Sequence, residues 1–260
     1  MKLAKDQIAR QFSRAASTYD QAAHLQHEMA EKLIGSIPKL ATGKLGDLGC
    51  GTGWAVTKLA QKNRTDLIGI DIAPGMIEIA QARVPTAEVH CCDLEETPLD
   101  SNCADVVFSN AAIQWCNVNG AIQEIYRICK PNGFAVFSTF GPRTLCEIRS
   151  AWRAAGDQRD RIHEFESAEL LQSILQRTGF ASIVDLAIER TFRFDSVDAL
   201  LRSIKQIGAT NASIGRPTGL LGTKRYLEFR DVFAQRLARE GHLQLTYECI
   251  FAVAEKQSSS

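Results

Sequence analysis

Seven consecutive residues combine an acid with three glycines in a pattern that could bind a small molecule. They are Asp47-Leu48-Gly49-Cys50-Gly51-Thr52-Gly53, and they lie between a short apolar segment and a segment with helical spacing. Glycines let the chain turn tightly and approach a ligand without a Cβ in the way. The dinucleotide fingerprint G-x-G-x-x-G would place a third glycine at position 54, which is Trp54 here. The spacing therefore disfavours a pyrophosphate cofactor.

Two more acids follow the next two apolar segments. Asp71 ends the segment Ile68-Gly69-Ile70-Asp71, where a carboxylate could accept both hydroxyls of a ribose. The pair Asp93-Leu94 follows the third apolar segment and could meet an adenine amine. Each acid by itself could equally cap a helix. Together with the glycine loop they predict a ligand-binding site.

These residues need a scaffold that brings the ends of several strands together. Short apolar segments alternate with amphipathic ones from residue 44 onward, which is typical of βαβ units and a parallel sheet. The expected strands are Lys44–Leu48, Leu67–Ile72, Ala87–Cys91, Ala104–Ser109 and Phe134–Phe140. The expected helices are Ala55–Gln61, Gly75–Arg83, Ala121–Cys129 and Leu145–Ala155. In this α/β fold Asp71 and Asp93 both lie at strand ends.

The two ends of the chain follow other patterns. Residues 1–40 repeat apolar side chains at three- and four-residue steps and predict helices. After residue 156 we expect a helix at Ser167–Arg177, a strand at Ser182–Phe194, helices at Val197–Ile207 and Lys224–Arg239, and a strand at Leu243–Ala254. A loop between the last two helices is predicted by Gly208, Gly215, Pro217, Gly219 and Gly222.

The expected organisation has three parts. An N-terminal helical cap covers 1–40, a core with a sheet that ends in an antiparallel pair covers 41–194 and 242–256, and an inserted helical lid covers 195–241. The lid is basic: 202–239 contains eight Lys and Arg and two acids, a net of +6. It is either a solvated face or a docking surface for an acidic partner.

The composition excludes several classes of protein. The 260 residues carry 30 Lys+Arg and 30 Asp+Glu, and a zero net charge disfavours a nucleic-acid binder. No apolar run reaches the roughly 20 residues that cross a bilayer, and the first ten residues lack the apolar core of a signal peptide. The eight cysteines include no C-x-x-C pair, so we expect reduced thiols, mostly buried. These features predict a soluble, cytoplasmic protein.

The glycine loop, Asp71, Cys92-Asp93-Leu94-Glu95-Glu96 and Ser109-Asn110-Ala111-Ala112-Ile113-Gln114-Trp115 resemble the class I S-adenosylmethionine-dependent methyltransferases. The resemblance covers roughly residues 44–140. It implies a Rossmann-like, seven-stranded sheet with the glycine loop under the methionine part of the cofactor, Asp71 on the ribose and Asp93 near adenine. The residues it assigns to the cofactor are Asp47, Gly49, Gly51, Gly53, Asp71, Ile72, Asp93, Leu94 and Asn110.

Other segments narrow the resemblance to one family. Four segments are similar to the malonyl-acyl-carrier-protein O-methyltransferases of biotin synthesis: Phe12-Ser13-Arg14-Ala15-Ala16-Ser17-Thr18-Tyr19-Asp20, Leu25-Gln26 behind it, the lid segment 202–211 and Leu245-Thr246-Tyr247-Glu248. These segments span nearly the whole chain. The resemblance implies methylation of the free carboxylate of a malonyl group carried by acyl-carrier protein or coenzyme A.

That reaction needs no acid–base residue. A carboxylate has an unperturbed pKa of roughly 4, so it is ionised at neutral pH and needs no general base and no metal. The five histidines form no ligand cluster in the sequence. The enzyme has to align and desolvate the acceptor. The candidates for this are Arg14, Tyr19, Arg202 and Lys205, with Arg143 as a weaker one; each could instead belong to a packed or solvated helix face.

Three other functions stay open at this stage. One is methylation of another small acid such as trans-aconitate, and a second is methylation of a quinone precursor, for which a more apolar lid is expected. A third is a catalytically silent cofactor-binding protein that regulates a partner. The intact glycine loop with Asp71 and Asp93 disfavours the third.

Overall fold

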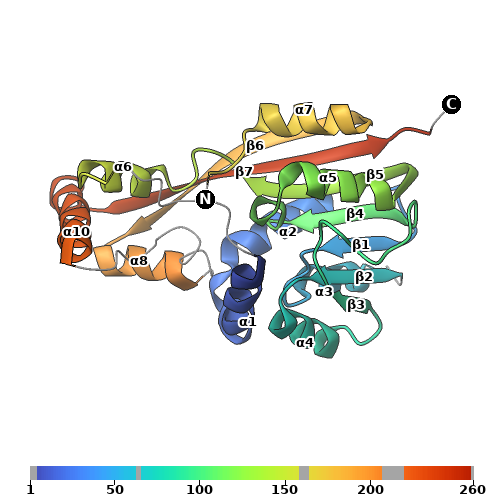
Figure 1. Cartoon of the computed structure of the whole chain (residues 1–260), viewed down its shortest axis with the longest axis horizontal. Coiled ribbons are helices and arrows are strands. Elements are labelled where there is room, and N and C mark those ends of the chain that lie inside the picture. Colours follow the sequence, from blue (N-terminus) through green and yellow to red (C-terminus); the bar gives the residue numbers. More distant parts are fainter. Residues whose placement is uncertain (1–4, 63–65, 158–163, 207–219, 259–260) are drawn as a thin grey trace.

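The protein is built on one seven-stranded sheet with the order β3-β2-β1-β4-β5-β7-β6 (Figure 1). The computed structural model describes residues 5–62, 66–157, 164–206 and 220–258. The strands are β1 Leu45–Leu48, β2 Leu67–Asp71, β3 Glu88–Cys91, β4 Ala104–Asn110, β5 Cys129–Phe140, β6 Phe180–Phe194 and β7 Leu243–Lys256. The first five strands are parallel, and β7 runs antiparallel to both of its neighbours. The expected α/β fold with a terminal antiparallel pair is confirmed.

The helices lie close to the expected positions. Their bounds are α1 Lys5–Ala22, α2 His24–Gly35, α3 Trp54–Gln61, α4 Pro74–Arg83, the short η1 Ile113–Trp115, α5 Val118–Ile128, α6 Cys146–Ala154, α7 Ala168–Thr178, α8 Val197–Gln206 and α10 Leu220–Glu240. Buried apolar side chains join α5 and α7 to one face of the sheet and α2 and α3 to the other. Strand β5 begins five residues earlier than predicted, because Cys129 already pairs with Ala104 before a shift in register.

Strands β6 and β7 continue beyond the rest of the sheet and carry a second lobe (Figure 1). Helices α8 and α10 pack there, and α6 joins them because the Trp152 ring stacks on Phe229 with centroids 4.2 Å apart. Phe229 and Phe233 of α10 are fully enclosed, as are Leu200 and Ile204 of α8. The apolar core on one face of the sheet therefore continues into the lobe.

The predicted glycine-rich loop is only partly covered by the described ranges. Gly208, Gly215, Pro217 and Gly219 lie outside them. Gly222 lies within α10, which begins at Leu220, so its assignment to a loop is wrong. The helix begins four residues earlier than predicted.

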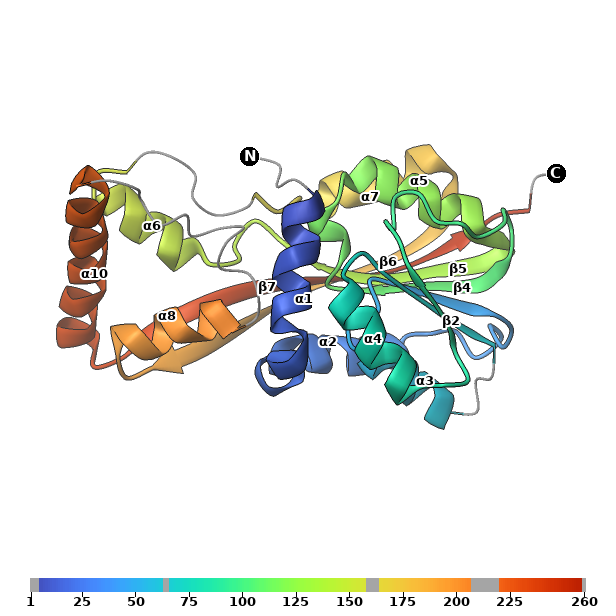
Figure 2. The same cartoon turned by 60° about the horizontal axis from the view of Figure 1, so that its bottom comes forward.

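Helix α1 stands between the sheet and the second lobe (Figure 2). It rests on the start of α4, where the Gly75 amide donates to Ser13 Oγ at 3.2 Å. A Cβ on Gly75 would lie only 2.9 Å from the Ser13 carbonyl oxygen. A glycine at this position therefore allows α1 to approach the sheet closely.

The expectations about membrane-spanning segments and about the cysteines can be compared with the described residues. None of its helices is long and apolar enough to cross a membrane. All eight cysteines are free thiols, but only Cys50, Cys129 and Cys249 are buried, so the expectation that most would be buried is wrong.

We predict that Phe229→Ala lowers the free energy of unfolding by about 3–5 kcal/mol, because it leaves a cavity under Trp152. Leu227→Ala is the matched control on the same helix: Leu227 is 55% exposed, and its loss should cost less than about 0.5 kcal/mol. Urea unfolding of both variants measures the difference. Equal effects would show that the ring stack adds nothing to the stability of the lobe.

Candidate functional site

The glycine loop joins β1 to α3 in a conformation that few other residues adopt. Gly49, Gly51 and Gly53 have φ angles of +81°, +55° and +76°. The amides of Gly49 and Cys50 both donate to the Ile70 carbonyl oxygen, at 2.7 and 2.8 Å, which fixes the loop to the end of β2. A Cβ on Gly49 would lie 2.2 Å from the Ala112 Cβ, so a larger residue would displace the segment after β4.

Asp71 ends β2 and holds the loop from the other side. Its Oδ2 accepts from the Gly51 amide at 3.0 Å, and its Oδ1 accepts from the Ala73 amide at 2.8 Å. Burial raises the pKa of Asp71 to about 6, although the backbone amides of Ala73 and Gly51 oppose this shift. Each carboxylate oxygen can accept a second hydrogen bond, so Asp71 can still bind hydroxyl groups of a ligand.

Asp47 is a buried acid without a complete set of partners. Its side chain belongs to β1 and is 1% exposed, and within the described structure Oδ2 has no hydrogen-bond partner. Burial raises the pKa of Asp47 to about 8, and the nearby charge of Asp71 adds to the effect. A buried acceptor of this kind is costly unless a donor arrives to meet it.

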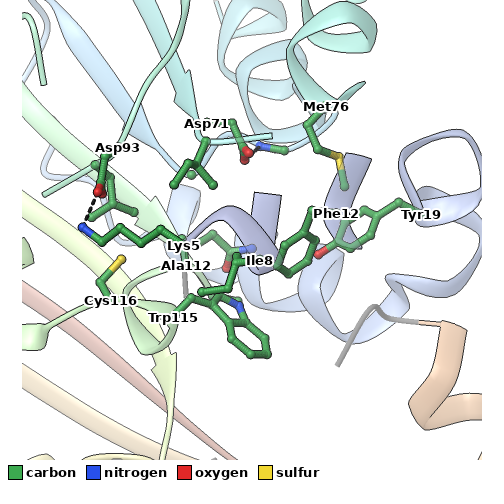
Figure 3. Close-up of a pocket in the computed structure, with 16 residues that line it drawn as sticks. Lys5, Ile8, Phe12, Tyr19, Asp71, Met76, Asp93, Ala112, Trp115 and Cys116 are labelled. Carbon is green, nitrogen blue, oxygen red and sulfur yellow. Dashed lines mark hydrogen bonds and ion pairs between the residues drawn. The ribbon is translucent and has the colours of Figure 1, made fainter. Parts of the chain in front are cut away.

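Asp93 follows β3 and already has a cationic partner. Lys5 of α1 forms an ion pair with Asp93 (Figure 3). It forms a second ion pair, at 3.0 Å, with Glu95. The Asp93 Oδ1 also accepts from the Glu95 amide at 3.0 Å. Sequence analysis did not single out Lys5, because a lysine near the start of an amphipathic helix carries no pattern that distinguishes it from a solvated one.

Three adjoining cavities surround these residues. The first, here the glycine-loop cavity, is lined by Lys5, Ile8, Phe12, Tyr19, Gly49, Gly51, Asp71, Ile72, Met76, Asp93, Leu94, Asn110, Ala111, Ala112, Trp115 and Cys116. The Asp47 cavity is lined by Tyr19, Gln26, His27, Ala30, Asp47, Gly49, Cys50, Gly51, Thr52, Trp54, Ala55 and Asn110. The aromatic cavity is lined by Phe12, Tyr19, Gln26, Ala111, Gln114, Trp115, Phe140, Thr144, Leu145, Phe165 and Tyr247. Tyr19 lines all three.

Helix α1 forms one side of this site. Figure 3 shows Lys5, Ile8, Phe12 and Tyr19 following one another along the glycine-loop cavity, with Trp115 beside Phe12. The Phe12 ring meets Trp115 edge-on, with centroids 5.7 Å apart, and meets Tyr19 at 6.2 Å. Burial raises the pKa of Tyr19 well above its usual value, and the charges of Asp71 and Asp20 add to this, so its hydroxyl stays protonated.

Most of the predicted ligand-binding residues lie together. Asp47, Gly49, Gly51, Asp71, Ile72, Asp93, Leu94 and Asn110 line the first two cavities. Gly53 lines neither and instead precedes the first turn of α3. The Asn110 amide is also structural, since its Nδ2 donates to the Gln26 carbonyl oxygen at 3.0 Å and its Oδ1 accepts from Ser138 Oγ at 2.7 Å.

The basic candidates for the acceptor lie elsewhere. Arg14 is on the exposed face of α1, two residues from Phe12 and therefore on the other side of the helix. Arg202 is exposed on α8, and the side chain of Lys205 lies outside the described structure. Arg143 is exposed and pairs with Glu189 at 2.6 Å. Of the four positioning candidates, the cavities bring in Tyr19, and no other lines them in the described structure.

No group of three or more His, Cys, Asp or Glu side chains in the described ranges is arranged to hold a metal ion. The site instead offers backbone amides, buried and half-buried carboxylates and aromatic rings, which suit an organic ligand with a cationic end.

Comparison with protein families places residues 46–137 in the Methyltransferase domain family. Over its whole length the chain is similar to malonyl-acyl-carrier-protein O-methyltransferases. It is 34% identical to the enzyme of Gallionella capsiferriformans, over 97% of this chain and 91% of that one, and 38% identical to that of Methylovorus sp., over 97% and 89%. It is also 35% identical to a biotin biosynthesis bifunctional protein of Saccharophagus degradans, over 95% of this chain and 46% of that one.

Solved structures show the same fold at lower identity. The YcgJ protein of Bacillus subtilis aligns with a TM-score of 0.62 and 16% identity, over 90% of this chain and all of that one. Phosphoethanolamine N-methyltransferase 2 of Haemonchus contortus aligns with a TM-score of 0.56 and 20% identity, over 89% of this chain and 53% of that one.

The ligand-free protein should lose stability as the pH rises, because folded Asp47 holds a proton that the unfolded chain releases. Its pKa is about 8 when folded and about 4 when unfolded, so this contribution is complete below pH 4 and is lost between pH 4 and 8, by at most about 1.4 kcal/mol per unit. Asp47→Asn should remove this slope between pH 6 and 8, a range above the folded pKa of Asp71, about 6.

Urea unfolding at pH 6, 7 and 8 measures the slope. Asp66→Asn serves as the control, since that side chain is 61% exposed and should leave the slope unchanged. A slope that persists in Asp47→Asn would mean that the Asp47 carboxyl is already ionised in the folded protein.

Proposed function

The chain belongs to the malonyl-acyl-carrier-protein O-methyltransferase family, and we propose that it methylates the free carboxylate of a malonyl thioester at the point where the three cavities meet. It is an S-adenosylmethionine-dependent methyltransferase. The observation that carries the proposal is the position of Tyr19, which lines the two cavities suited to the cofactor and the one suited to the acceptor.

The residues present fit S-adenosylmethionine, which when bound supplies a methyl group on a positively charged sulfur. The unpartnered Asp47 Oδ2 suits the ammonium of the cofactor's amino-acid end. In the adjoining glycine-loop cavity, Asp71 suits the ribose hydroxyls and Asp93 the adenine amine. We assign these three roles on that basis.

The aromatic cavity fits the acceptor. Its described lining is made of aromatic and aliphatic side chains and neutral polar groups, from Phe12 and Tyr19 of the cap to Tyr247 of β7. Methyl transfer removes one negative charge from the acceptor carboxylate and one positive charge from the donor sulfur. Because the two charges disappear together, a weakly polar surrounding favours the reaction over one that solvates both ions.

Tyr19 is the residue we place next to the reacting atoms. Its hydroxyl keeps its proton at neutral pH and can donate a hydrogen bond to the acceptor, so it orients the nucleophile and does not act as a base. The acceptor needs no base, since its own carboxyl group is ionised above about pH 4. In this proposal catalysis rests on alignment and on exclusion of water.

We further propose that the lobe at the end of β6 and β7 docks the acyl carrier. The proposal keeps the three-part division into 1–40, 41–194 with 242–256, and 195–241, and adds α6 to the lid because Trp152 stacks on Phe229. Helix α10 contributes Lys224 and Arg225 to the basic surface of the lid. An acidic carrier protein is the partner that such a surface would attract.

A cytoplasmic location is part of the same proposal. It is supported by the free thiols of Cys91 and Cys146, which are exposed and which an oxidising compartment would tend to pair or modify.

The activity is tested by incubating the protein with methyl-labelled S-adenosylmethionine and malonyl-, succinyl- or acetyl-carrier protein. Label should enter the malonyl substrate and should not enter the acetyl one, which has no free carboxylate. Mild alkali should release the label as methanol, as expected of a methyl ester. Label on acetyl-carrier protein, or none on any diacid thioester, would contradict the proposed acceptor.

Reversing the charge of α10 should distinguish recognition of the carrier protein from recognition of the malonyl group. We expect Lys224→Glu with Arg225→Glu to lower kcat/KM for malonyl-carrier protein about tenfold or more at low salt, and to change kcat/KM for malonyl-coenzyme A less than about twofold. Arg230 is left intact because it pairs with Asp198 of α8 at 2.8 Å and supports the lobe.

The control for this pair is Lys39→Glu with Lys62→Glu, an equal change of charge at two exposed lysines beside α2 and α3. The control should behave as wild type with both substrates. If the α10 variant loses activity equally on both, with no dependence on salt, the basic face of α10 is not a carrier-docking surface.

A further inference from the structure

Gln26 of α2 is a buried polar residue between two of the cavities. It is 8% exposed and lines both the Asp47 cavity and the aromatic cavity. Its backbone is held in place, because its carbonyl oxygen accepts from Asn110 Nδ2 at 3.0 Å. The side chain therefore extends from a fixed backbone position at the boundary between the space we assign to the cofactor and the space we assign to the acceptor.

The amide oxygen of Gln26 lacks a partner. In the described part of the chain, Gln26 Oε1 is buried without a hydrogen bond, and so is Asp47 Oδ2, whose residue lines the same cavity. Once Asp47 is ionised, both oxygens are acceptors at one cavity, and a ligand group with at least two N–H bonds can satisfy them together. A primary ammonium has three and no acceptor, and the negative charge of an ionised Asp47 would favour it further.

His27, the next residue, does not supply that donor. Its Nε2 lies 3.5 Å from Asp20 Oδ1, so the imidazole faces the Asp20 carboxylate, and its ring stacks on Trp54 with centroids 4.3 Å apart. The histidine is thus oriented by Asp20 and Trp54. Among the described residues, Tyr19 and Gln26 are the two that line both the Asp47 cavity and the aromatic cavity.

We propose that Gln26 binds both substrates at once: its Oε1 accepts a hydrogen bond from the ammonium of the cofactor, and its amide NH₂ donates one to the acceptor carboxylate. The second half rests on the proposed function. An amide suits this task because it carries an acceptor and two donors on one rigid plane. Such a bridge fixes the attacking oxygen relative to the amino-acid end of the cofactor, and therefore relative to the methyl group.

Two substitutions separate the two contacts. Gln26→Glu keeps an acceptor for the ammonium but replaces the donor with a negative charge, so S-adenosylhomocysteine should bind as tightly as to wild type or more tightly. The KM for malonyl-carrier protein should rise about tenfold or more. Gln26→Leu removes both groups and should weaken S-adenosylhomocysteine about tenfold. Calorimetry measures the binding of the product, and initial rates measure KM and kcat.

The control ligand is 5′-methylthioadenosine, which has the adenosine part but no ammonium or carboxylate. Neither variant should change its affinity, whereas a merely structural role of Gln26 would lower the affinity of both ligands together. Gln21→Glu is the matched control variant, because Gln21 is exposed on α1 and undergoes the same change of charge. It should leave both affinities and KM as in wild type.

The proposal is overturned if Gln26→Leu binds S-adenosylhomocysteine like wild type, or if it loses both ligands equally while its urea unfolding matches wild type. Equal effects of Gln26→Glu and Gln26→Leu on S-adenosylhomocysteine would also overturn the ammonium contact. If wild type methylates no malonyl thioester, the proposed function fails and the acceptor contact fails with it, while the two binding measurements still decide the ammonium contact.

Discussion

The arrangement of the whole site depends on one carboxylate, Asp20, near the end of α1. Its Oδ1 accepts from Thr52 Oγ1 in the glycine loop at 2.7 Å, and its Oδ2 pairs with Arg83 at the end of α4 at 2.5 Å. Arg83 also donates to Thr52 Oγ1 at 3.0 Å. Burial would raise the pKa of Asp20, but the hydrogen bonds from Thr52 and Arg83 hold it below its usual value, so the group is charged. A charged, hydrogen-bonded group of this kind joins α1 to the glycine loop and to α4, and it fixes the end of α1 that carries Tyr19.

Before a ligand binds, the site also contains two acids whose ionisation costs free energy in the folded protein. Asp47 is buried and the nearby Asp71 is half-buried, and burial raises the pKa of both. Two acids in this situation weaken the folded state as they ionise, and a cationic ligand relieves the cost. The aromatic side of the site has the opposite character, because its described lining includes Phe12, Trp115 and Tyr247 and no charged side chain. Acidic and weakly polar surfaces thus form different walls of the same site.

The order of strands and helices was largely predictable because alternating βαβ segments have few ways to form a sheet. Where the prediction was wrong, contacts between residues far apart in the sequence determined the structure. The start of β5 at Cys129 follows from its pairing with Ala104, and α6 packs in the second lobe because Trp152 finds the ring of Phe229 some 77 residues later in the chain. Gly222 lies in α10 although glycine disfavours helices, since Phe229 and Phe233 bury that helix against the lobe.

By itself the sequence determined the fold class, the glycine loop and the positions of Asp47, Asp71 and Asp93, because these depend on local spacing at the ends of strands. The tertiary structure alone decided which other side chains reach them. Lys5 pairs with Asp93 across 88 residues, and Gln26 and Tyr247 approach the same cavity from the cap and from the last strand. Arg14 and Tyr19 occur in one motif, yet only Tyr19 turns inward, because the twist of α1 sends residues of one short segment to opposite faces. Such convergence depends on how helices pack on the sheet, and no local pattern records it.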